Sequence, residues 1–306
     1  MSHFLSPIFA SGFFESEAVH IALGVGALVA LVTGVVGVFT VIRGQSFAGE
    51  AFGDLGTTGG SGAYLVGVGT LWGFVLGNVV AAGAMEAIGV QRARGRDLAT
   101  GIVLGGGIGL AALFLHLYTT QHSTTGATVT ILFGSVFAIS STTIPLILAL
   151  SAVVLAITLT ICRPLLLSSV SAEMASARGI PVRLVGMLYL LALALAAALA
   201  AITIGTILST ALIVGPAASA LRLTKRPLSA MLAAAGIGIS AMWLGIVLAY
   251  DSYYWPPHHS IWPVSFFVVT FVFIIYLLSG LPEAKRRRQA ERSPSEPPAV
   301  QPLAAG

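Results

Sequence analysis

The sequence contains little charge, since only 8% of its 306 residues are Asp, Glu, Lys or Arg, whereas a soluble domain carries about 25%. Hydrophobic residues make up 57% of the chain, and the mean hydropathy is +0.96. These values exclude a soluble protein. Because one membrane span takes about 20 apolar residues, the length predicts an all-α, polytopic transmembrane helix bundle of about eight or nine spans.

Several catalytic signatures are missing as well. The chain has one cysteine, Cys162, which excludes an internal disulfide and a cysteine metal cluster. The glycine run GIVLGGGIGLAA (101–112) lacks the G-K-[ST] ending of a phosphate-binding loop. No H-E-x-x-H motif supports a membrane metalloprotease. We therefore expect neither enzymatic activity nor a permanently bound cofactor, and the sequence suggests no nucleic-acid partner.

The basic residues predict the topology. We expect spans at about 18–42, 46–68, 70–90, 97–118, 128–162, 184–203, 205–221, 228–250 and 262–281. All 15 Lys and Arg residues fall in alternate loops, which the positive-inside rule assigns to the cytoplasm. This places the chain in the plasma membrane, with its N-terminus outside and its C-terminus in the cytoplasm.

Three regions follow from this topology. Residues 1–17 are expected to form an extracytoplasmic N-terminal segment, and residues 18–281 the transmembrane domain in the lipid bilayer. Residues 282–306 are basic and then rich in Pro and Ser. This composition predicts a disordered cytoplasmic tail whose basic run lies against anionic lipid headgroups.

The second predicted span contains two acids, in the stretch RGQSFAGEAFGD (43–54). Asp54 lies eleven residues after Arg43, or about 16 Å along a helix, near the middle of the membrane. Glu50 lies one turn nearer the cytoplasm on the same face. An acid at this depth costs at least about 2.5–3.5 kcal/mol, so it is a functional candidate by default. The alternative is a structural pair, protonated or bonded to Ser46, Thr57 or Thr58.

The acids are followed by LGTTGGSGAY (55–64), whose glycines we expect to break the helix. A broken helix at mid-depth must face protein or a water-filled path, and transporters build ion sites in this way. Carboxylate oxygens suit Mn, Mg or Ca, and they suit Zn or Fe when imidazole joins them. The substrate expected on this interpretation is a divalent metal. Glu86, near the inner end of the third span, is expected to pair with Arg92 or Arg94.

All six histidines lie on the side of the membrane that lacks basic residues. One interpretation is an outer vestibule that attracts a cation, since imidazole and carboxylate are both metal ligands. Its candidate residues are His116, His122, Asp251, His258 and His259. The alternative is that these histidines lie at the membrane interface and bind nothing.

The longest internal loop contains AEMASARG (172–179). These residues favour a short helix, with Gly179 closing it and Pro181 following. Such a helix is too polar to span the membrane, so we expect it to dock on something at the inner surface.

Within this loop, Glu173, Ala175 and Gly179 form the pattern E-x-A-x-x-x-G. It resembles the coupling segment by which permeases of ABC importers fit into a groove of their ATPase. With residues 96–110, 131–140, 211–226 and 244–257, the chain resembles the family of ABC permeases that import zinc, manganese or iron, over about residues 18–281. The resemblance implies a permease, driven by a separate ATPase, that moves Mn, Zn or Fe into the cytoplasm. It further implies a second, identical permease subunit, a cytoplasmic ABC ATPase and an extracytoplasmic metal-binding protein.

Two departures from the family pattern change what the resemblance implies. The family commonly has G-D-A-L-S-H-A where this chain has GEAFGDL (49–55), so Glu50 takes the place of Asp and Asp54 that of His. The family pair lines the metal path, and two oxygen donors favour Mn or Fe over Zn. In the coupling loop, Ser171 and Ala172 replace the usual Asp and Pro. The competing hypothesis is a stand-alone secondary transporter that uses Glu50 and Asp54 as a proton or cation relay.

Overall fold

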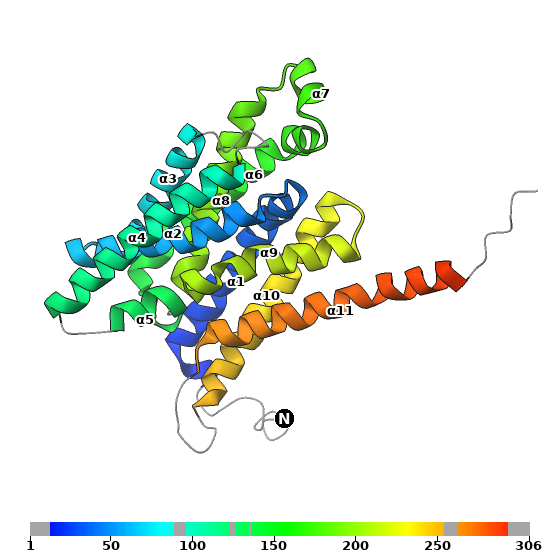
Figure 1. Cartoon of the computed structure of the whole chain (residues 1–306). Helices are drawn as coiled ribbons and strands as arrows, with labels where there is room; N and C mark the ends of the chain where they lie inside the picture. The colour runs from blue at the N-terminus through cyan, green and yellow to red at the C-terminus, as the bar shows by residue number, and fades with distance from the viewer. Residues whose placement is uncertain (1–12, 89–95, 123–125, 135, 254–261, 293–306) are drawn as a thin grey trace, which may run out of the picture.

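The computed structural model describes residues 13–88, 96–122, 126–134, 136–253 and 262–292 (Figure 1). The described residues form helices and connections without strands. The long helices are α1 (Glu17–Ile42), α2 (Ser46–Val66), α3 (Thr70–Ile88), α4 (Arg96–His122), α6 (Ile144–Val170), α8 (Val182–Ile204), α9 (Thr206–Leu223), α10 (Pro227–Ser252) and α11 (Val264–Arg292). The short ones are α5 (Gly126–Phe133), α7 (Ala172–Ala177), η1 (Phe13–Glu15), η2 (Val136–Ala138) and η3 (Ser141–Thr143).

Among the described helices, eight are long and apolar enough to cross a membrane. The remaining long helix, α2, is less apolar because it contains Glu50, Asp54 and several glycines. It nevertheless packs inside the bundle, against α3, α4, α8 and α9. The predicted all-α bundle of eight or nine spans is therefore confirmed.

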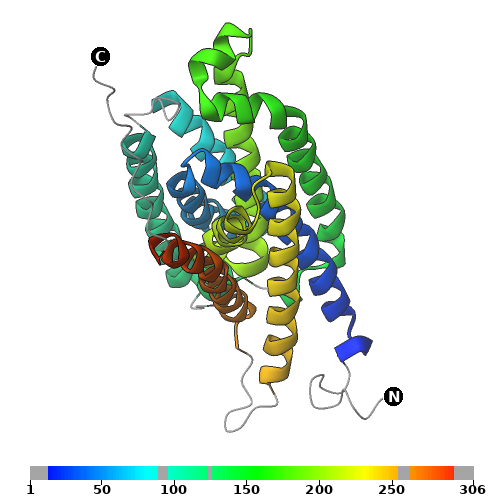
Figure 2. The ribbon, with the colours of Figure 1, turned by 90° about the vertical axis from the view of Figure 1, so that its right-hand side faces the viewer.

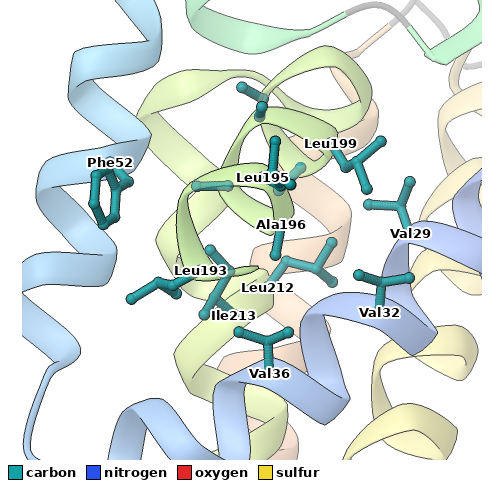
Figure 3. Packing of buried hydrophobic residues seen from close by; sticks show 14 of the residues in the cluster. Val29, Val32, Val36, Phe52, Leu193, Leu195, Ala196, Leu199, Leu212 and Ile213 are labelled. Carbon is teal, nitrogen blue, oxygen red and sulfur yellow. The ribbon is translucent and has the colours of Figure 1, made fainter. Parts of the chain in front are cut away.

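Helix α8 lies at the centre of the bundle and contacts α1, α2, α3, α6 and α9. Its alanine-rich stretch from Ala192 to Ala201 is almost wholly buried. Figure 3 shows side chains of this helix, such as Leu193 and Leu199, among valines of α1 and Leu212 of α9. Small side chains let helices approach closely in a membrane, where apolar burial alone does not favour a neighbouring helix over lipid.

The prediction that LGTTGGSGAY breaks the second span is wrong, because α2 continues without interruption to Val66. Its glycines serve close packing instead. A Cβ atom at Gly59 would overlap the carbonyl oxygen of Gly73 on α3, and one at Gly53 would overlap Ser209 on α9. The helix ends only at Gly67, whose φ of 73° is left-handed.

The two ends of the bundle differ in what they carry. Helix α7 lies at one end, between the end of α6 and the start of α8, and α1 begins at the opposite end (Figures 1 and 2). Helix α11 continues past Leu281 to Arg292. The predicted start of a disordered tail at residue 282 therefore falls inside this helix, and residues 293–306 lie outside the described part.

Candidate metal path and coupling helix

Helix α2 places Glu50 and Asp54 one turn apart on one face. In the single chain the Glu50 side chain is exposed and that of Asp54 is half-buried. The same face continues with Thr57, Ser61 and Tyr64, at the i, i+4, i+7, i+11 and i+14 spacing of one helical face. A polar face therefore runs along most of α2.

No hydrogen bond or ion pair joins the side chain of Glu50 or Asp54 to another residue that the structure describes. The threonines that could have bonded to them donate elsewhere. Thr57 Oγ1 donates to Thr206 Oγ1 on α9 at 2.8 Å, and Thr58 Oγ1 donates to the Gly107 carbonyl on α4 at 2.7 Å. The structural alternative, in which Ser46, Thr57 or Thr58 holds the acids, is thus not what the structure contains.

A cavity of about 550 Å³ lies beside the far end of α2, at the end of the bundle opposite to α7. Hydroxyl groups make up much of its polar lining: Tyr64, Thr70, Thr130, Ser140, Thr142 and Thr143. The buried Ser61 and the bond from Thr57 to Thr206 lie between this cavity and Asp54 along α2. The sequence analysis did not predict this cavity, although the spacing of polar residues along α2 leads towards it.

Of the residues proposed for an outer vestibule, the structure describes the side chains of His116 and Asp251, which lie on helices with different neighbours. His116 is exposed on α4, which packs on α2 and α3, whereas Asp251 is half-buried on α10, which packs on α1, α9 and α11. His122 ends α4, and His258 and His259 lie outside the described residues. Within the described part of the chain, no group of three or more His, Cys, Asp or Glu side chains could hold a metal ion.

Helix α7 forms as its sequence predicts. The Ser171 hydroxyl caps its start by accepting a bond from the Met174 amide at 3.2 Å. At its end, Gly179 has a φ of 74°, and the Ile180 amide bonds to the Ala175 carbonyl at 3.1 Å. This is a Schellman motif, so the predicted helix end at Gly179 is confirmed.

The side chains of this short helix divide between the bundle and the outside. Ala175 is fully buried and fixes α7 to the bundle, whereas Glu173 is exposed. The exposed face is therefore available to another protein. Of the three residues in the E-x-A-x-x-x-G pattern, Ala175 and Gly179 shape and seat the helix, and Glu173 is displayed.

Glu86 pairs with Arg183 of α8, where the Nε to Oε1 distance is 3.2 Å. The expected partners, Arg92 and Arg94, lie outside the described residues. Arg183 could not be chosen from the sequence because it lies 97 positions away, and only the packing of α3 on α8 brings the two together.

Comparisons with known proteins agree with this architecture. Residues 15–279 match the sequence profile of the ABC 3 transport family. The manganese transport system membrane protein MntC of Halalkalibacterium halodurans is 33% identical over 225 residues, covering 74% of this chain and 76% of that protein. The manganese import system permease protein ScaB of Streptococcus pneumoniae is 27% identical over 243 residues, covering 79% and 85%.

A solved structure supports the fold. PsaBC from Streptococcus pneumoniae, in complex with Fab, contains a chain that superposes with a TM-score of 0.78 at 23% identity, covering 92% of this chain and 98% of that one. The similarity to metal-ion ABC permeases predicted from the sequence is confirmed, and the chain belongs to the ABC 3 transport family.

Proposed function

We propose that this chain is the transmembrane permease subunit of an importer that moves a divalent transition metal, manganese first, into the cytoplasm. The observation that carries this proposal is the acid pair on α2. Glu50 and Asp54 share one helical face, and no described residue forms a hydrogen bond or ion pair with either carboxylate. The relatives named as manganese permeases support the choice of metal.

The electrostatics of the pair favour a passing dication. Two carboxylates one turn apart repel each other when both are ionised, and each loses hydration in the membrane. A divalent cation between them would remove both penalties. Because both donors are oxygen and α2 contains no histidine, the pair suits manganese better than zinc.

The pair is an incomplete ligand set in one chain, because hard cations take about six oxygen ligands. Glu50 is exposed, so a facing partner or water must supply the rest. A second copy related by a two-fold axis would present its own Glu50 and Asp54 to the same ion. We therefore assign the path to the interface of a homodimer.

The energy would come from a separate cytoplasmic ABC ATPase that binds α7, with Glu173 on the displayed face. An extracytoplasmic metal-binding protein would deliver the ion at the opposite end, near the hydroxyl-lined cavity. This assignment puts α7 and the C-terminus in the cytoplasm of a plasma-membrane protein and the N-terminus outside, in agreement with the distribution of Lys and Arg.

The test is radiometal uptake into proteoliposomes that contain the permease with or without its ATPase. We expect manganese uptake that requires both the ATPase and ATP, with zinc and iron as weaker competitors. Uptake without the ATPase, driven by a proton gradient, would instead establish the secondary transporter that uses Glu50 and Asp54 as a relay.

The same assay tests the metal preference. Replacing Asp54 by His adds an imidazole donor at the family position. We expect zinc to compete about tenfold better against manganese, equivalent to about 1.4 kcal/mol. An unchanged competition curve for Asp54→His would remove Asp54 from the set of metal ligands.

A further inference from the structure

Arg43 joins three helices at the end of the bundle that carries α7. It is the C-cap residue of α1. Its Nη1 donates to the Ser168 hydroxyl of α6 at 3.1 Å, and its guanidinium carbon lies 5.5 Å from the centre of the Tyr189 ring of α8. A hydrogen bond and a cation–π contact therefore fix this side chain in two directions.

The Tyr189 ring is itself held on α1. Tyr189 is fully buried, and its hydroxyl forms a 2.7 Å hydrogen bond with Thr40 Oγ1. The backbone of Thr40 takes part as well, because its carbonyl accepts a bond from the Gln45 amide at 2.8 Å. Thr40 thus connects the aromatic ring to the turn that follows α1.

This turn is short and is fixed by backbone hydrogen bonds. Gly44 has a φ of 62°, and its amide bonds to the Val41 carbonyl at 3.1 Å. Together with the bond from Gln45 to Thr40 this is a Schellman motif. The buried Gln45 then accepts a bond from the Gly49 amide at 3.0 Å and so begins α2. Arg43 and the first turn of α2 are therefore joined by one hydrogen-bonded turn.

The distances along the chain are short on both sides of Arg43. Glu50 follows Arg43 by seven residues and lies about 6 Å of helical rise past Ser46, where α2 begins. Ser168 precedes Ser171, the N-cap of α7, by three residues, less than one helical turn. Arg43 thus connects the last turn of α6, which leads into α7, with the turn that leads into α2.

We propose that Arg43 is a positioning residue that transmits the movement of α7 to α2 and so couples ATP hydrolysis to the position of Glu50 and Asp54. This inference rests on the proposed function, in which an ATPase acts through α7. Apolar helix surfaces can slide past each other. A guanidinium that is hydrogen-bonded to one helix and stacked on a ring of another holds the two helices at a fixed relative position.

The test compares Arg43→Gln with Arg222→Gln in the complete reconstituted transporter. Arg222 is a matched control because its guanidinium also lies over a tyrosine, Tyr276, at 3.9 Å. It is in the last turn of α9 and joins that helix to α11. The readouts are the number of manganese ions transported per ATP hydrolysed, the amount of copurified ATPase and the Tm.

We expect Arg43→Gln to copurify with the ATPase and to hydrolyse ATP, but to transport about five- to tenfold fewer ions per ATP, the size of a moderate coupling energy. Arg222→Gln should keep the wild-type ratio. Arg43→Lys should be intermediate, because lysine can still donate to Ser168 but lacks the planar group that stacks on the ring.

A second measurement separates transmission from stability. Spin labels at the exposed positions Ser176 on α7 and Phe47 on α2 should change their separation on ATP binding in the wild type and not in Arg43→Gln. Should Arg43→Gln fail to assemble, Ser168→Ala removes the hydrogen bond from Arg43, together with the bond that Ser168 Oγ donates to the Leu165 carbonyl within α6, and should also lower the ratio.

The outcomes keep the two proposals apart. A wild-type ratio in Arg43→Gln, or an equal fall in the Arg222→Gln control, overturns the role of Arg43 and leaves the importer intact. A wild-type ratio in Ser168→Ala, where only that variant assembles, overturns it as well. Absence of ATP-driven manganese uptake by the wild-type complex overturns the proposed function itself.

Discussion

Acidic side chains occur in two settings in this bundle. Glu86 on α3 is mostly buried and lies 3.2 Å from Arg183 of α8. Glu50 and Asp54 on α2 face each other's charge, and no described residue forms an ion pair with them. The difference is that Arg183 balances the charge of Glu86, whereas no described side chain forms an ion pair with either acid on α2. An acid tied to arginine joins two helices, and an untied pair suits a mobile cation.

The largest expected effect comes from neutralising the α2 pair. The double variant Glu50→Gln, Asp54→Asn keeps the shape of both side chains but removes the charges that would attract a dication. We expect manganese uptake to fall by at least about 100-fold, equivalent to about 2.7 kcal/mol. The measurement is radiolabelled manganese uptake into proteoliposomes by the wild type and the double variant.

The control for that experiment is Glu86→Gln, which removes an acid of the other kind. It should leave uptake within about twofold of the wild type, or about 0.4 kcal/mol. If Glu86→Gln stopped uptake while the double α2 variant transported normally, the contrast between the two settings would be reversed.

A smaller effect is expected from disturbing the contact between α2 and α3, the two helices that carry these acids. Gly59→Val places a side chain against the backbone of α3 at Gly73, so we expect it to destabilise the protein by about 2–3 kcal/mol. Gly83→Ala is the control on α3, because a Cβ atom there meets nothing within 4 Å. Thermal melting of the detergent-solubilised protein, followed by size-exclusion chromatography, compares them. Equal Tm values for both variants would contradict the close contact of α2 and α3.

The smallest effect is expected for the ion pair itself. The side chain of Arg183 is 79% exposed, and exposed pairs contribute about 0.2–1 kcal/mol. Arg183→Gln should therefore lower the Tm only slightly, and addition of salt should reduce the difference from the wild type. A loss as large as that of Gly59→Val would mean that this pair does more than join α3 to α8.

Much of the fold could be predicted because helix length and composition are local properties. The expected spans 46–68 and 70–90 correspond to Ser46–Val66 and Thr70–Ile88. The end of α7 at Gly179 followed from the need for a left-handed residue there. Such features depend on a few neighbouring residues, so the sequence alone contains them.

Features that depend on packing were not predictable. The glycines after Asp54 were expected to interrupt α2, but tertiary contact makes them positions of close approach to α3 and α9. The partner of Glu86 and the bond from Thr57 to Thr206 each join helices that are distant in sequence. For the site, the sequence indicated the two acids, while the surrounding hydroxyl groups required the packed bundle.

The contact between Gly59 and Gly73 has a mechanical consequence. Where two backbones touch, neither helix can shift along the other without first separating, so α2 and α3 form one stiff hairpin. In any cycle that opens the protein to one side of the membrane and then the other, this hairpin must tilt as a unit. Such a tilt would move Glu50 and Asp54 together, without changing the distance between them.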